Sequence, residues 1–105
     1  MDTAAKIDRF TRLQAGWHYG EGGPCAPQAC TMAQHLAARA QRAGLATDAF
    51  PGLDGGVLLM IYGPEGEDAV RCETDGTLSW TREGQESHEG DGLSLEALLG
   101  LLGWA

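Results

Sequence analysis

The sequence predicts an α+β domain with two N-terminal helices, a small antiparallel sheet of about three or four strands, and a short C-terminal helix. Apolar residues recur at helical spacing up to residue 43. Beyond residue 46, short apolar runs are separated by Asp-Gly turns, which is typical of β-hairpins. A helix-start signal then precedes a leucine-rich C-terminal segment. A chain of 105 residues is expected to form one domain over residues 1–105.

The first helix is expected from Thr3, as the N-cap, to about Gln14. Ile7, Phe10 and Leu13 fall three residues apart and form one narrow apolar stripe. Trp17 extends this stripe, so we expect it to be a core residue that ties the first helix to the sheet. The glycine-rich segment 15–26 that contains it is expected to be a loop.

The second helix is expected over residues 27–43. Pro27 suits the first helical position, where the missing N–H costs nothing, and Gly44 is a typical left-handed C-terminal stop. The apolar stripe of this helix consists mostly of small side chains, which allow a helix to approach a sheet closely. Its members are Cys30, Ala33, Leu36, Ala37 and Ala40.

Two hairpins and a final helix follow. A short strand at 47–51 and the Asp54-Gly55 turn lead into 57–62, an unbroken apolar run that predicts a central strand covered on both faces, or nearly so. Residues 69–74 and 77–82 form the second predicted hairpin, and 83–92 is expected to be an acidic loop. Ser94 is expected to cap a helix from Leu95 to about Gly103, with Leu93 as a hydrophobic staple.

A pattern in the first half of the chain is similar to that of small bacterial and phage-borne proteins. It consists of a Gly-Trp and Tyr-Gly pair, a proline-rich helix entry, a P-x-x-D-G-G turn and an apolar strand. The matching residues are Gly16, Trp17, Tyr19, Gly20, Pro24, Pro27, Pro51, Asp54, Gly55 and Gly56. The chain departs from this pattern at Ala26, where serine is common, and at Met60 and Ile61, where Glu-Trp is expected. The resemblance covers about residues 13–61. It implies a fold and carries over no catalytic residue.

The acidic excess is confined to the second half of the chain. The net charge is −8; residues 1–64 hold five acids and five bases, whereas 65–105 hold ten acids and two bases. This balance argues against contacts with nucleic-acid phosphates. No apolar run is long enough to cross a bilayer, and the N-terminus lacks signal-peptide features. Three cysteines without an export signal indicate a cytoplasmic protein.

The cysteines and histidines do not form a recognisable metal site. Cys25, Cys30 and His35 are separated by four residues each, which is a loose spacing without a second close pair. We therefore expect neither a metal nor another cofactor. Cys25 precedes a helix N-terminus, a setting that activates thiols, and His18 is a conceivable base, but no third residue orients it.

The last helix carries apolar residues around most of its circumference. Such a helix is buried on two sides, by the sheet and by either a thin core or a second subunit. The residues expected at a homodimer interface are Leu98, Leu101 and Trp104.

These observations predict a non-enzymatic acidic protein that binds a basic protein surface. The concrete form is a phage or bacterial inhibitor of the anti-CRISPR or nucleic-acid-mimic type. An antitoxin or immunity-like protein would have the same sequence features. The alternative class is a small enzyme or ligand-binding module that uses the Trp17–Cys25 loop. The residues expected to contact the partner are Asp68, Glu73, Asp75, Glu83, Glu86, Glu89 and Asp91.

Overall fold

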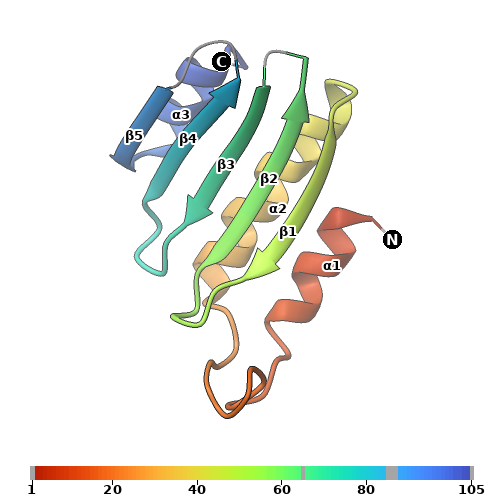
Figure 1. Cartoon of the computed structure of the whole chain (residues 1–105), viewed down its shortest axis with the longest axis vertical. Coiled ribbons are helices and arrows are strands. Elements are labelled where there is room, and N and C mark those ends of the chain that lie inside the picture. Colours follow the sequence, from red (N-terminus) through yellow and green to blue (C-terminus); the bar gives the residue numbers. More distant parts are fainter. Residues whose placement is uncertain (1, 65, 85–87, 105) are drawn as a thin grey trace.

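The computed structural model describes residues 2–64, 66–84 and 88–104, which form three helices and a five-stranded sheet (Figure 1). The elements in chain order are α1 (Thr3–Phe10), α2 (Pro27–Arg42), β1 (Ala46–Pro51), β2 (Val57–Gly63), β3 (Gly66–Cys72), β4 (Leu78–Gly84), β5 (His88–Leu93) and α3 (Leu95–Leu102). The strands follow one another across the sheet in chain order, and every neighbouring pair is antiparallel. The predicted α+β class is confirmed.

The sheet has one strand more than expected. Residues 88–93, of which 88–92 fall in the predicted acidic loop, pair with β4 as the edge strand β5. Two glycines and two acids interrupt any apolar alternation in this segment. The register of β5 shifts opposite Leu78 and Trp80, as in a β-bulge, so its pattern is irregular even in the structure.

The helices cover one face of the sheet and one of its edges. Figure 1 shows α2 and α3 behind the strands and α1 beside β1. The α2 helix contacts β1, β2 and β3, while α3 contacts β4. Because no described helix lies on the opposite face, that face is open.

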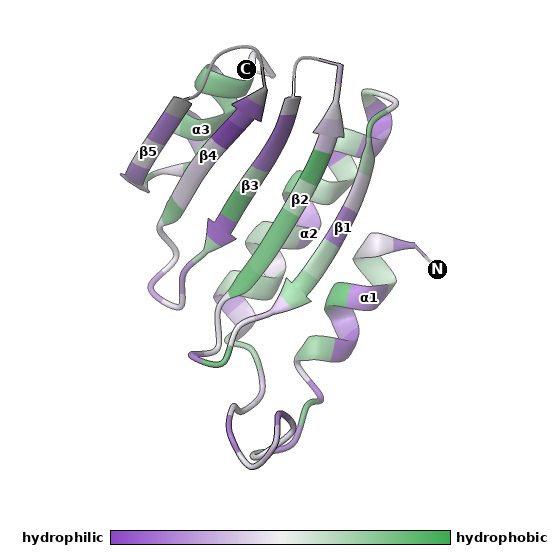
Figure 2. Cartoon of the chain, in the orientation of Figure 1, coloured by the Kyte–Doolittle hydropathy of each residue, from purple (hydrophilic) through white to green (hydrophobic). Residues whose placement is uncertain are grey.

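The core lies between α2 and the sheet, where Figure 2 shows apolar ribbon on both layers. Val57, Leu59 and Ile61 of β2 are buried against the small residues of α2, as the stripe of that helix predicts. The intervening residues Leu58 and Met60 are only half-buried. The expectation that β2 is covered on both faces is therefore wrong. Its apolar run is continuous because the open face is also partly apolar.

The first helix is shorter than predicted, and its cap is different. The carboxylate of Asp2 accepts a hydrogen bond from the Ala4 amide at 3.3 Å, so Asp2, and not Thr3, is the N-cap. Thr3 instead donates its hydroxyl to the Thr47 carbonyl at 3.2 Å, which fastens α1 to the edge strand. The helix ends at Phe10, well before the expected end at Gln14.

The other two helices agree closely with their signals. Pro27 opens α2, and Gly44, two residues after its last helical residue, has a φ of +78°. The Ser94 hydroxyl accepts a hydrogen bond from the Ala97 amide at 3.2 Å and caps α3. None of the helices in the described ranges has the length and apolar character needed to cross a membrane.

Trp17 belongs to its own loop and not to the core between α1 and the sheet, contrary to expectation. Its indole Nε1 donates to the Gly23 carbonyl at 2.8 Å. The ring also packs so closely on Gly22 that a Cβ there would lie 2.7 Å from Nε1. Trp17 therefore holds the shape of the 15–26 loop, which extends beyond the end of the sheet in Figure 1.

Candidate functional site

The open face of the sheet consists of the side chains that alternate with the core residues on each strand. Strand alternation and register place them on one side, opposite α2 and α3. They are Ala46, Asp48, Phe50, Leu58, Met60, Tyr62, Glu67, Ala69, Arg71, Ser79, Thr81, Glu83, Glu89 and Asp91. This set divides into an apolar part over β1 and β2 and an acidic part over β3, β4 and β5.

The apolar part is a row along β2 with Phe50 beside it. Leu58 and Met60 are half-buried, and Tyr62 is 40% exposed. At the rim, Lys6 of α1 reaches over the edge of the sheet. Its Nζ lies 2.6 Å from an Asp48 oxygen and 4.8 Å from the centroid of the Phe50 ring. This hydrogen bond lowers the pKa of Asp48, so the rim carboxylate is neutralised by the protein itself.

The acidic part contains carboxylates that have no such partner. Glu67 of β3 and Glu83 of β4 stand directly opposite each other in register. Glu89 of β5 pairs in register with Thr81, and Asp91 accepts a hydrogen bond from the Ser79 hydroxyl at 2.7 Å. In the described ranges, none of Glu67, Glu83 and Glu89 forms an ion pair. Like charges directly opposite in a sheet are unfavourable for folding.

Two hollows lie side by side on this part of the face. The first, of about 150 Å³, is lined by Met60, Glu67, Ala69, Thr81 and Glu83. The second, of about 380 Å³, is lined by Ser79, Trp80, Thr81, Glu89, Gly90 and Asp91. Thr81 borders both hollows, and each is walled by two carboxylates. The small Ala69 between Met60 and Thr81 leaves the floor of the first hollow low.

The structure places only some of the predicted partner-binding carboxylates on the open face. Glu83, Glu89 and Asp91 lie there. Glu73 follows β3 and lies 4.0 Å from the Arg71 guanidinium. Asp75 is in the β3–β4 turn, where hydrogen bonds from the amide and hydroxyl of Thr77 lower its pKa. Glu86 lies outside the described residues.

Asp68 is not a surface residue, and its assignment to an exposed patch is wrong. It lies on the helix side of β3 and is only 5% exposed. Its Oδ1 accepts hydrogen bonds from the Trp80 indole at 2.9 Å and from Arg82 Nε at 2.7 Å. Arg82 Nη2 donates to the other oxygen at 3.2 Å, which completes a two-pronged pair. This carboxylate therefore joins β3 to β4 inside the protein.

Sequence reasoning missed Glu67 and the apolar row beside it. Glu67 lies two residues before the segment expected to be a strand, and Tyr62 lies at the end of the run expected to be covered on both faces or nearly so. The sequence does contain part of the signal for an open face, because Val57, Leu59 and Ile61 alone form one complete alternating set that can fill the core side of the strand. Nothing in the sequence required the other set to be buried as well.

The predicted dimer interface on α3 is only partly exposed. Leu98 is fully buried in the core, which contradicts its assignment to an interface. Trp104 packs partly buried against the same core, and its carbonyl accepts a hydrogen bond from Arg39. Leu101, at 50% exposed, is the residue of the three that faces solvent.

The three cysteines are buried free thiols, which opposes an activated nucleophile. The Cys25 thiol donates to the Gly56 carbonyl at 3.4 Å, and burial raises its pKa. Burial also raises the pKa of Cys30 to about 11 and that of Cys72 to about 12. Among the described residues, no group of three or more His, Cys, Asp or Glu side chains is arranged to hold a metal ion.

The 15–26 loop presents aromatic rings and no thiol. His18 packs edge-on between Trp17 and Tyr19, with ring centroids 5.5 and 4.9 Å apart. Tyr19 is 96% exposed and has a φ of +51°, a left-handed conformation that costs a non-glycine residue about 1–2 kcal/mol. Because Cys25 is buried, the solvent-exposed part of the loop presents no thiol.

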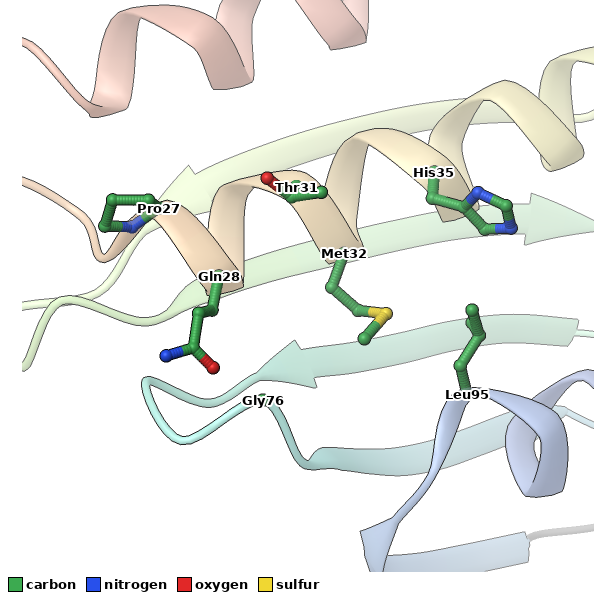
Figure 3. A pocket seen from close by; sticks show the side chains of 7 residues that line it. All are labelled: Pro27, Gln28, Thr31, Met32, His35, Gly76 and Leu95. Atoms are coloured by element: carbon green, nitrogen blue, oxygen red, sulfur yellow. The ribbon is translucent and has the colours of Figure 1, made fainter.

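A groove of about 520 Å³ separates α2 from α3 on the helix side (Figure 3). Met32 of α2 and Leu95 of α3 point into it from its two sides, and Gln28 and His35 lie at its rim. The remaining lining residues are Pro27, Thr31 and Gly76. The lining contains no carboxylate, lysine or arginine, so it does not distinguish one chemical class of ligand from another.

Comparison with known proteins adds no functional assignment: no family model, curated protein or solved structure matches the chain significantly.

Proposed function

We propose that this protein is a non-enzymatic interaction protein that binds a basic protein surface through the open face of its sheet. The observation that carries the proposal is the row of carboxylates over β3 to β5, in which Glu67, Glu83 and Glu89 have no ion-pair partner in the described ranges. A partner with lysines and arginines would supply the missing countercharges. Charge complementarity of this kind accelerates association and selects the partner.

The concrete form of this function is inhibition of a nucleic-acid-binding protein by a phage or bacterial polypeptide that mimics nucleic acid. A rigid sheet that displays carboxylates competes with phosphates for the same lysines and arginines. An anti-CRISPR protein that blocks the nucleic-acid groove of a defence complex would act in this way. An antitoxin or immunity protein for a basic toxin would use the same face, and the identity of the partner separates the two.

Affinity capture from the native host, followed by mass spectrometry, identifies the partner. Binding of the purified pair is then measured for the wild-type protein and for a Glu83→Lys/Glu89→Lys variant at several salt concentrations. We expect the variant to bind at least about tenfold more weakly, and the wild-type association rate to fall as salt rises. Binding that ignores both salt and the charge reversals would mean that the carboxylates serve solubility alone.

A Glu21→Lys/Glu96→Lys variant is the matched control. Glu21 lies in the 15–26 loop and Glu96 in the first turn of α3, so both are exposed and neither is on the open face. The control has the same net charge as the test variant. An equal loss of affinity in both would indicate a long-range effect of net charge and not a docking site.

A further inference from the structure

The combination of an apolar row and an acidic row on the same face indicates the shape of the partner element. We infer that the open face binds a basic amphipathic α-helix of the partner, which lies along β3 with its apolar side over Met60 and its basic side toward Glu67 and Glu83. This inference rests on the proposed function and adds the secondary structure and residue pattern of the bound element.

The spacing of the rows matches the width of a helix. The apolar row runs along β2, and the acidic rows begin on β3 and β4. Neighbouring strands are about 4.8 Å apart, so β2 and β4 are separated by about 10 Å. An α-helix with its side chains is about 10–12 Å wide. A helix above β3 therefore contacts the apolar row with one side and the carboxylates with the other.

The floor under this position is low enough to receive side chains. Ala69 lies at the centre of β3, with Met60 and Thr81 as its neighbours in register. The 150 Å³ hollow above Ala69 has an apolar floor and is walled by Glu67 and Glu83. A lysine or arginine fits such a site because its methylene stem packs on apolar atoms while its charged group reaches a carboxylate.

Other occupants of the face are opposed by its charge and by the sheet edges. A second copy of the chain would bring the same unpaired carboxylates together, and like charges across an interface are strongly unfavourable. An added strand would pair with an edge and leave the open face uncovered. The β1 edge is already fastened to α1 through Thr3 and Thr47, and β5 carries the irregular register of a bulge.

A helical segment is also the element that carries basic residues into nucleic acid. The major groove of DNA admits an α-helix whose lysines and arginines contact phosphates and bases. A nucleic-acid mimic that covers such a helix would remove the binding element itself. The inferred partner element is thus consistent in chemistry with the inhibitor proposed above.

The test uses two synthetic leucine–lysine peptides of about 18 residues, or five helical turns. In one, the leucines repeat at helical spacing and form an apolar stripe; the other has the same composition in a scrambled order. Binding to the full chain is measured by calorimetry at low salt. We expect the amphipathic peptide to bind at least about tenfold more tightly than the scrambled peptide, because only the former matches both rows.

Variants of the chain locate the binding site. Met60→Thr and Glu67→Gln/Glu83→Gln are each expected to weaken the amphipathic peptide by about tenfold. Leu53→Thr and Glu21→Gln/Glu96→Gln, which change exposed residues outside the face, should bind it as the wild type does. Circular dichroism verifies that each variant is folded, and Tyr62→Thr replaces Met60→Thr if the latter unfolds.

Each other outcome overturns the inference in a distinct way. Equal binding of both peptides would show that binding depends on charge alone. This result would refute the inference of a helical partner element and leave the proposed function intact. Equal losses in test and control variants would place the peptide elsewhere and count against both. No binding of either peptide would refute the helix and leave the proposed function to its own charge-reversal experiment. A wild-type dimer that Met60→Thr dissociates in sedimentation would show that a second copy covers the face.

Discussion

Replacing Glu83 by lysine is expected to stabilise the isolated protein while weakening its binding to a basic partner. In the folded chain Glu83 lies directly opposite Glu67, and neither carboxylate forms an ion pair with a basic side chain in the described ranges. The substitution converts a repulsive cross-strand pair into an attractive one. Substituting a residue that stabilises the fold lowers the free energy of unfolding of the protein. A substitution that raises this free energy and weakens binding therefore marks a residue retained for function.

The size of the gain follows from the geometry of the pair. Cross-strand charge pairs contribute about 0.2–1 kcal/mol, and a reversal replaces a penalty of that size by a benefit. Both side chains are exposed, so solvent screening keeps the net change at about 0.5–1 kcal/mol. For a domain of this length, such a change raises the thermal midpoint by about 2–6 °C.

Urea unfolding monitored by tryptophan fluorescence measures the change at low and high salt. We expect Glu83→Lys to raise the free energy of unfolding at low salt, Glu83→Gln to give about half of that gain, and high salt to reduce both. In a Glu67→Gln background, most of the gain from Glu83→Lys should disappear, because the interaction is pairwise. A loss of stability, or an equal gain in both backgrounds, would refute the opposed-carboxylate argument.

The other predictions concern the interior and the pH limits of the fold. Asp68→Asn should lower the free energy of unfolding by about 3 kcal/mol in urea titration, because it removes the negative charge of a buried carboxylate that accepts hydrogen bonds from Trp80 and Arg82. Cys72 has a raised pKa, so its neutral thiol is favoured in the folded state; stability is fully present below the unfolded pKa of about 8.5 and falls as the pH rises toward 12. Replacing Cys72 by alanine should flatten that alkaline decline in midpoints measured between pH 7 and 11. Asp48 has a lowered pKa, so its contribution is present above the unfolded pKa of about 3.9 and is lost as the pH falls further. Asp48→Asn should therefore remove a small part of the acid destabilisation, under about 1 kcal/mol, and Lys6→Met should do the same.

Local signals predicted the helices and turns because the groups that satisfy those signals are close in the chain. Pro27, Gly44 and Ser94 each act on backbone within a few residues, so their effects are readable from the sequence. The cap of α1 shows the limit of this reasoning. Thr3 has the right side chain for a cap, but its hydroxyl is taken by Thr47, which is distant in the chain.

The candidate site was harder to predict because it depends on register. Alternation already puts Asp68 on the same side of its strand as Val70 and Cys72, which are core residues. What the sequence lacks is the register that brings Arg82 opposite Asp68 and makes a buried carboxylate tolerable. The same register places Glu83 opposite Glu67.

The ion pairs separate the carboxylates that stabilise the fold from those that we propose to bind a partner. Where both residues lie in the described ranges, the ion pairs are Lys6–Asp48, Arg12–Asp8, Arg71–Glu73 and Arg82–Asp68. Three of these four pairs lie outside the acidic rows. Lys6–Asp48 is at the rim of the sheet, Arg12–Asp8 is at the C-terminal end of α1, and Arg82–Asp68 is in the interior. Glu67, Glu83 and Glu89, which form no ion pair in the described ranges, lie on adjacent strands of the face that no described helix covers, and the repulsion between Glu67 and Glu83 works against folding. A chain selected for stability alone would place a lysine opposite Glu67, since a single substitution suffices. The retained repulsion is therefore the strongest physical argument that the countercharges come from a partner.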